Sequence, residues 1–182
     1  LHELTELFRT FPGIGPRQAG RFTHFLLERP EAARVLADLA RALPDTAVRC
    51  ALCRRFFVRE GAHSACRMCR SETRDSRTII IIARDVDIDA LEKSGSYRGR
   101  YFVLGKETKA LCVRAAAAAK EGLREIILAL SASPEGEEMA EAAAATLAPL
   151  AQQQSIKITR LGRGLSTGTE LEYADAETLK NA

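Results

Sequence analysis

The sequence of 182 residues contains no tryptophan and only two methionines, and aromatic residues make up 5% of it. So few aromatic side chains argue against recognition of single-stranded RNA by base stacking. No run of eighteen apolar residues occurs, so no segment predicts a membrane span. No charged start followed by an apolar stretch resembles a secretory signal, and we expect a cytoplasmic protein.

Lysine is missing from the first 77 residues, which carry 14 arginines against 9 acidic residues, a net charge of +5. The remaining 105 residues carry 13 basic and 15 acidic side chains, a net charge of −2. Arginine forms forked contacts with phosphate, so this asymmetry indicates nucleic-acid binding by the front part of the chain. The alternative is that the charged residues only form the solvent-exposed faces of helices.

Four of the five cysteines form two CxxC pairs separated by twelve residues: Cys50, Cys53, Cys66 and Cys69. Zinc binds four thiolates as a tetrahedron, and each pair offers two sulfurs on one tight turn. Disulfides or a redox CxxC are alternatives, but no secretory signal and no strand-to-helix setting supports them. We expect one structural zinc per chain, without an open coordination position, and His63 is not needed as a ligand.

The N-terminal segment, residues 1–47, predicts three helices. Residues 2–10 and 31–43 carry apolar side chains at helical spacing, and a helix between them begins at Pro16. The sequence Phe11-Pro-Gly-Ile-Gly-Pro16 cannot continue a helix and predicts a hairpin, with Ile14 filling the core.

Such a helix-hairpin-helix presents backbone N–H groups and a helix N-terminus, which together suit a DNA phosphate. Two arginines one helical turn apart would add charge-assisted hydrogen bonds. The alternative is a plain helical turn. We expect sequence-independent DNA binding by Gly13, Ile14, Gly15, Arg17 and Arg21.

The cysteine segment, residues 48–77, contains eight arginines. They are a second candidate phosphate site. We expect Phe56, Phe57 and Val58, between the cysteine pairs, to form its small apolar core. A module of this size depends on its metal for folding.

Strands and helices alternate in residues 78–161, which predicts an α/β domain with a parallel sheet. The β-branched run Thr78-Ile-Ile-Ile-Ile82 is typical of a strand buried on both faces. We expect further strands at 101–104, 125–130 and 156–161, and helices at 85–93, 108–121 and 134–148, the last one ended by Pro149. Cys112 is expected to be a buried thiol, and residues 162–182 a loop and a short helix.

The order of these modules over nearly the whole chain resembles the bacterial recombination mediator family RecR. The most specific pieces are the hairpin, the four cysteines and the segments Leu91–Gly99, Glu135-Gly-Glu137 and Leu171–Asp175. The resemblance implies an α+β chain of three modules: a helix-hairpin-helix (1–47), a zinc finger (48–77) and a Toprim domain (78–161). The tail, 162–182, would contribute to oligomer contacts.

The resemblance also implies a DNA repair function in the nucleoid. Such a protein joins a RecO-like or RecF-like partner, helps to load the recombinase on gapped or single-stranded DNA, and forms a homo-oligomer, a tetrameric ring. Asp87, Glu135 and Glu137 are expected to contact the partner.

The chain departs from catalytic Toprim enzymes, which hold magnesium with a Glu after the first strand and an Asp-x-Asp after the third. Here Ala83 follows the first strand, Ser131-Ala-Ser133 follows the third, and a longer loop expected after Gly105 is missing. We therefore expect no catalytic residue and no enzymatic activity. The alternative is a divergent nuclease or primase that uses Asp85, Asp87 and Glu135.

Overall fold

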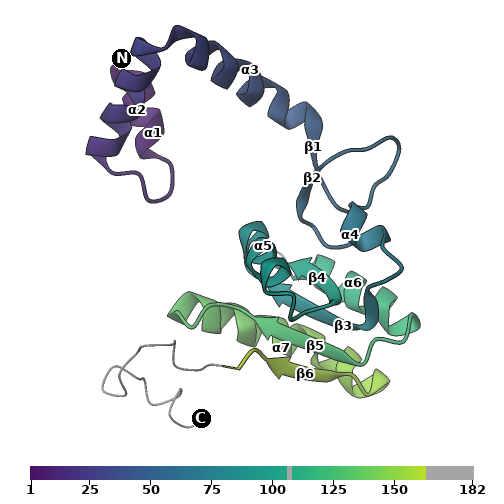
Figure 1. Cartoon of the computed structure of the whole chain (residues 1–182). Helices are drawn as coiled ribbons and strands as arrows, with labels where there is room; N and C mark the ends of the chain where they lie inside the picture. The colour runs from purple at the N-terminus through teal and green to yellow at the C-terminus, as the bar shows by residue number, and fades with distance from the viewer. Residues whose placement is uncertain (106–107, 163–182) are drawn as a thin grey trace. The chain divides into compact units, whose positions relative to one another are not determined.

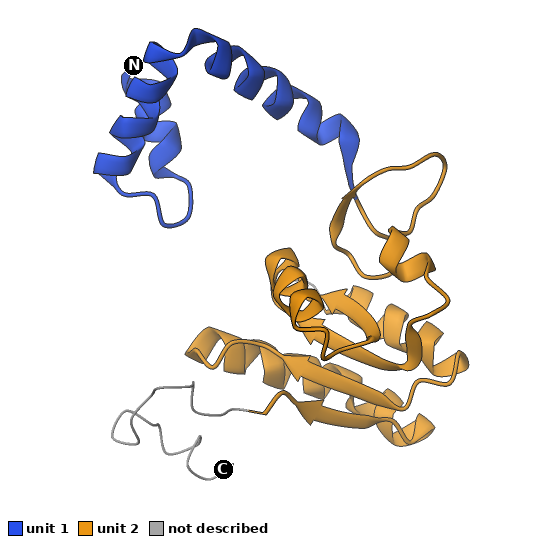
Figure 2. Cartoon of the chain, in the orientation of Figure 1, with its two compact units in different colours: residues 1–48 blue, residues 49–182 orange. Residues whose placement is uncertain are grey.

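The structure, a computed structural model, describes residues 1–105 and 108–162. The chain divides into two compact units, residues 1–48 and residues 49–182 (Figure 2). Each unit is described by itself. The segment expected to form the C-terminal loop and helix lies, except for Gly162, outside the described residues.

The first unit consists of helices α1 (His2–Arg9), α2 (Pro16–Glu28) and α3 (Pro30–Thr46), as the sequence predicts (Figure 1). Its packing centres on Phe8, whose ring meets Phe11 and Phe22 edge to face at centroid distances of 5.8 and 5.6 Å. Ile14 is half-buried and therefore only partly fills the core. The hydroxyls of Thr5 and Thr23 join α1 to α2 at 2.9 Å.

Helix α3 buries none of its residues against the described part of the chain. Its apolar face stays exposed, with Leu39 and Leu43 exposed to 62% and 58%. Leu4, Leu7 and Phe11 near the N-terminus are exposed as well. The first unit therefore leaves much of its apolar surface unpaired within the described chain.

The second unit contains a four-stranded parallel sheet in the order β4-β3-β5-β6. Its strands are β3 (Asp75–Ile82), β4 (Gly99–Val103), β5 (Glu125–Ala129) and β6 (Lys157–Arg160). The isoleucines of β3 are at most 2% exposed, which confirms a strand buried on both faces. The described part of the unit also has helices α5 (Asp85–Ser94), α6 (Lys109–Lys120) and α7 (Pro134–Gln154), and the cysteine segment has β1 (Ala47–Arg49), β2 (Phe56–Val58) and α4 (Arg67–Arg70).

The strand order determines which face each helix covers. The chain moves from β3 to β4 in one direction and then returns past β3 to β5 and β6. Right-handed crossovers then place α5 on one face and α6 and α7 on the other. Ile79 and Ile81 accordingly pack with α6 and α7, whereas Ile80 and Ile82 pack with α5 and the cysteine segment.

Two local predictions are wrong. Helix α7 does not end at Pro149 but runs through it to Gln154. Proline removes one hydrogen bond, but the extra turns bury Ala151 beside Leu147, and this packing offsets the loss. Phe56 and Val58 form no apolar core, since they are exposed to 51% and 67% and only Phe57 between them turns inward.

None of the helices in residues 1–105 and 108–162 is sufficiently long and apolar to cross a bilayer.

Candidate functional site

The hairpin between α1 and α2 turns at two glycines. Gly13 has φ +77°, a left-handed conformation that glycine adopts without strain, and Gly15 caps α2 in an extended conformation. The N–H of Ile14 is taken by the carbonyl of Phe11 at 3.1 Å, and Pro16 has none. The N–H groups of Gly13, Gly15 and Arg17 make no hydrogen bond with any described residue. They are the donors left for an anion.

Arg17 and Arg21 lie in the first two turns of α2, four residues apart, and both are exposed. Neither forms an ion pair with the described residues. Both guanidinium groups are therefore available for the same strand of a nucleic acid.

The four cysteines come together as the spacing predicts. Their sulfur atoms all lie within 4.8 Å of one another, and three of the side chains are buried. Cys53 Sγ and Cys66 Sγ are 3.7 Å apart, and none of the cysteines forms a disulfide. Exposed His63 is not part of the cluster.

The geometry fits a tetrahedral metal ion. Zinc–sulfur bonds of about 2.3 Å place two sulfurs of a tetrahedron roughly 3.8 Å apart, close to the distance between Cys53 and Cys66. Backbone N–H groups of Cys53 and Cys66 point at Cys50 Sγ, at 3.5 and 3.3 Å, and would stabilise a thiolate there. Four cysteines can therefore hold one ion and leave no position for a water molecule.

The thiols influence one another's charge. Hydrogen bonds from Cys53, Cys66 and Cys69 lower the pKa of Cys50, and the same contact with Cys50 raises the pKa of Cys53. Hydrogen bonds within the cluster also lower the pKa of Cys66, to about 6, and raise that of Cys69, so the protein groups alone do not favour ionisation of all four thiols. A dication would allow all four to ionise.

The cysteine segment is attached directly to the sheet. The N–H of Val103, at the end of β4, donates to the carbonyl of Cys53 at 2.8 Å. The carboxylate of Asp85, at the start of α5, accepts the N–H of Phe56 at 2.6 Å. Cys50, Cys53 and Cys66 share one buried cluster with Ile80 and Ile82. A metal ion at the cysteines would therefore stabilise one face of the sheet as well as the loop.

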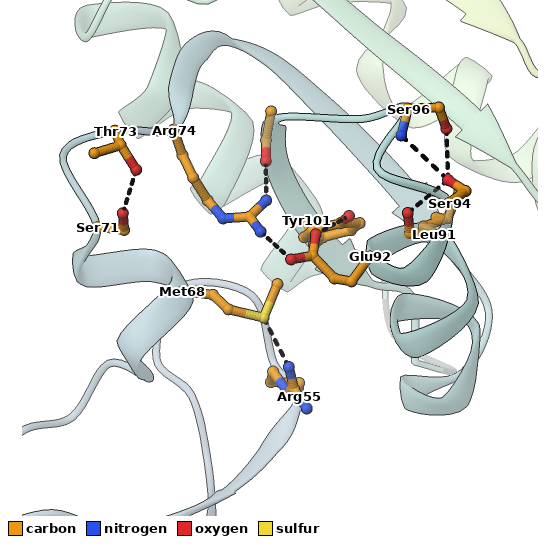
Figure 3. Close-up of polar contacts among 11 residues, drawn as sticks. Arg55, Met68, Ser71, Thr73, Arg74, Leu91, Glu92, Ser94, Ser96 and Tyr101 are labelled. Carbon is orange, nitrogen blue, oxygen red and sulfur yellow. Dashed lines mark hydrogen bonds and ion pairs between the residues drawn. The ribbon is translucent and has the colours of Figure 1, made fainter.

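A polar network follows the last cysteine (Figure 3). Arg74 donates to the carbonyl of Gly99 at 2.8 Å and to the carboxylate of Glu92, and its guanidinium lies 5.2 Å from the centre of the Tyr101 ring. The Tyr101 hydroxyl donates to Glu92 at 2.5 Å. Burial opposes the ionisation of Glu92, yet the bonds from Arg74 and Tyr101 lower its pKa below the ordinary value. The network fixes α5 to the segment that leaves the cysteines.

The carboxylates predicted to contact a partner lie at one edge of the sheet. Strands β3 and β5 are parallel neighbours, so the loops after them emerge at the same edge. Asp87 accepts the N–H of Arg84 at 3.1 Å and pairs with its guanidinium, while Glu137 pairs with Arg160 at 2.7 Å. Bonds from its own N–H and from the Ser133 hydroxyl lower the pKa of Glu135. Among the residues that the structure describes, the cysteines alone gather as a candidate metal site.

Comparison with known proteins covers both units. A family model described as "RecR, helix-hairpin-helix" matches residues 1–47, and a Toprim domain model matches residues 77–162. The protein named Recombination protein RecR of Chloroflexus aggregans is 36% identical, over 98% of this chain and 89% of its own length. Those of Cyanothece sp. and Methylorubrum populi are each 35% identical, over 100% of this chain and 92% of theirs. The chain belongs to the RecR family.

Within this member of the family, the sheet from β3 to β6 matches the Toprim domain, and α1 to α3 match the helix-hairpin-helix. The sequence prediction missed the link between Arg74, Glu92 and Tyr101. One signal was present: a tyrosine in an apolar strand needs a partner for its hydroxyl. The identity of that partner depends on the sheet register and could not be found from spacing.

Proposed function

We propose that this RecR-family protein is a DNA repair and recombination mediator that binds DNA and has no catalytic activity of its own. The observation that supports it best is the hairpin, where three N–H groups and two arginines that pair with no described residue lie at one turn. Such donors contact phosphates and not base edges, so binding is independent of sequence. The relatives' name, Recombination protein RecR, supports the role in recombination.

The cysteine cage binds one structural zinc in this proposal. Cys50, Cys53, Cys66 and Cys69 hold it, and four thiolates are the ligand set that zinc prefers in structural sites. The ion stabilises the fold and takes no part in a reaction.

The Toprim edge serves as a contact for a RecO-like or RecF-like protein through Asp87, Glu135 and Glu137. Catalysis there is unsupported because Ser131-Ala-Ser133 stands where the Toprim enzymes have an Asp-x-Asp. Asp85 holds the N–H of Phe56, and Asp87 holds Arg84. Ala83 stands where the Toprim enzymes have a glutamate.

We further propose a homo-oligomer, a tetrameric ring, in which a second copy covers apolar residues of the first unit. The exposed faces of α1 and α3 support this, since three short helices bury too little area to be stable alone. Sedimentation or light-scattering mass with and without DNA measures it, and a monomer under all conditions would contradict it.

The test of DNA binding is the double variant Arg17→Ala with Arg21→Ala. Because each phosphate contact releases counterions, the slope of log affinity against log salt should fall by about one to two on duplex DNA, for every sequence tested. Zinc content and oligomer mass should not change, because both side chains are exposed.

The matched control is Arg34→Ala with Arg41→Ala, which removes two exposed arginines of α3 and should leave the slope unchanged. A second pair, Arg59→Ala with Arg67→Ala, tests the arginines of the cysteine segment. Loss of DNA binding in this pair, with normal binding by the hairpin variant, would show that the hairpin is only a turn. Magnesium-dependent cleavage of the same labelled DNA would disprove the absence of catalysis.

A further inference from the structure

A pocket lies between the first cysteine turn and helix α6, all within the second unit. Its volume is about 470 Å³, within the usual range for small-molecule sites. Three arginines line it: Arg49, Arg54 and Arg114. Apolar side chains provide its walls, among them buried Phe102 and exposed Val113. No described residue that lines it is acidic.

Arg114 is the unusual member. It projects from the alanine-rich helix α6 and is only 5% exposed, although arginine is rarely buried without a partner. Its Nε and Nη1 are buried and make no hydrogen bond with any described residue. A buried cation without a counter-charge reduces the free energy of unfolding. The charge of Arg114 is therefore expected to destabilise the fold unless a ligand pairs with it.

The two other arginines are held in place around it. Arg49 donates to the carbonyl of Arg54 at 2.9 Å, and its guanidinium lies 4.1 Å from the centre of the Phe56 ring. Arg54 follows Cys53 at φ +64°, a left-handed conformation that a non-glycine residue adopts only with strain. The turn demands that conformation, but it does not demand an arginine. The Nε of Arg54 is also buried and without a partner.

The chemistry of the pocket identifies its ligand. Three guanidinium groups that form no ion pair with a described residue match the double charge of a phosphate better than a single carboxylate, and their forks suit phosphate oxygens. The apolar wall of Phe102 and Val113 suits a planar group attached to that phosphate. We propose that this arginine pocket, lined by Arg49, Arg54 and Arg114, binds a nucleoside 5′-phosphate, either as a free nucleotide or as the 5′ end of a DNA strand.

Calorimetric titration of the full-length protein tests this with deoxyadenosine 5′-monophosphate, deoxyadenosine, inorganic phosphate and acetate. The monophosphate should bind, phosphate alone should bind more weakly, and deoxyadenosine and acetate should not bind measurably. Arg114→Met should weaken binding of the monophosphate by about 10- to 100-fold, the loss expected for charged hydrogen bonds. Arg124→Gln, which changes the same charge at an exposed position, is the control and should bind normally.

The melting temperature distinguishes a role of Arg114 in ligand binding from a role in stabilising the fold. If Arg114 serves a ligand, Arg114→Met should melt at the same or a higher temperature without ligand, because an unpaired buried charge is gone. Arg54→Gly relieves the backbone strain and should also melt no lower, yet lose affinity. This second variant keeps the test valid if Arg114→Met does not fold.

The two sources of the phosphate are distinguished in the Arg17→Ala, Arg21→Ala background, in which the proposed hairpin site is removed. A 5′-phosphorylated oligonucleotide that binds more tightly than its 5′-hydroxyl form indicates a strand end, and preference for the mononucleotide indicates a free nucleotide. Failure of the monophosphate to bind, equal binding by acetate, or unchanged affinity in both pocket variants would overturn the proposal. Binding of a glutamate-rich peptide in place of the monophosphate would overturn it too, in favour of a protein partner.

Discussion

The two units of the chain bury apolar surface in opposite ways. In the second unit, the isoleucines of β3 are almost completely enclosed by helices on both faces. In the first unit, only Phe8, Ala19 and Thr23 are buried, and α3 encloses nothing. Helices α1 to α3 are strongly amphipathic, so the first unit does not lack apolar faces, and the difference comes from what lies opposite them.

This difference separates two sources of stability. The second unit has a sheet, which offers two apolar faces, and a four-cysteine cage that closes one of them. The first unit has helices alone, and these three helices bury few side chains between them, which makes so small a unit marginally stable. We infer that the stability of the second unit depends on its own core and metal, and that of the first on a neighbouring molecule.

The largest effect should come from removal of the metal. Cys53→Ser or Cys66→Ser should lose zinc and unfold or aggregate the second unit, because structural zinc contributes on the order of 10 kcal/mol in small zinc domains. Elemental analysis and circular dichroism measure the two losses. Cys112→Ser removes a cysteine outside the cage and should keep both zinc and fold. A well-folded Cys53→Ser protein would show that the sheet does not depend on the cage.

A smaller effect is expected from matched truncations in the two units. Ile81→Ala, at a fully buried position, should reduce the free energy of unfolding by about 2 to 5 kcal/mol. Leu39→Ala, at an exposed position of α3, should change it by less than about 0.5 kcal/mol in the monomer. Denaturant titration measures both values.

The same two variants can contradict the inference that the first unit depends on a neighbouring molecule. In an oligomer that covers α3, Leu39→Ala should destabilise the assembly, and the loss should grow on dilution through the dissociation range. An equal loss at every protein concentration would mean that α3 is packed within its own chain.

The parts of the fold that depend on local chemistry could be predicted from the sequence. The run of four isoleucines required a strand with two buried faces, and the helix expected at 85–93 is α5, which ends at Gly95 with φ +63°. Local rules failed where packing between distant segments determines the structure. Pro149 should end a helix, yet the burial of Ala151 against the sheet extends it. Phe56 and Val58 looked apolar enough for a core, but side chains alternate along a strand, and in this one the inward face carries Phe57 alone.

The candidate sites also divide into those that local sequence predicts and those that depend on packing between distant segments. The spacing of the cysteines was sufficient to predict the cage, and Gly13 and Gly15 to predict the hairpin. Arg114 gave no signal, because an arginine in an alanine-rich helix is ordinarily exposed. Its burial follows from the docking of the cysteine turn next to α6, which no local pattern encodes.

The smallest predicted effect concerns pH and again separates the units. Hydrogen bonds from Arg74 and Tyr101 hold the pKa of Glu92 below its ordinary value of 4.5, against the opposing effect of burial. A carboxyl group whose pKa is depressed by folding contributes stability above its unfolded pKa. That contribution is lost as the pH falls through the folded pKa. Glu92→Gln should therefore destabilise the second unit by about 1 kcal/mol at pH 7, a value reduced by the partial exposure of the side chain.

The destabilisation caused by Glu92→Gln should shrink from about pH 5 downward, because the wild-type carboxyl is then protonated too. Glu6→Gln is the matched change in the first unit, where Glu6 pairs with Arg9 at 2.8 Å while both side chains are nearly half exposed. An exposed pair three residues apart contributes little, so this variant should change stability by less than about 0.5 kcal/mol at either pH. Thermal melts of both variants at pH 7 and pH 4 provide the comparison. A Glu92→Gln effect that stays constant across this range would mean that Glu92 contributes through packing and not through its charge, and the second unit would then owe its stability to apolar contacts and the metal alone.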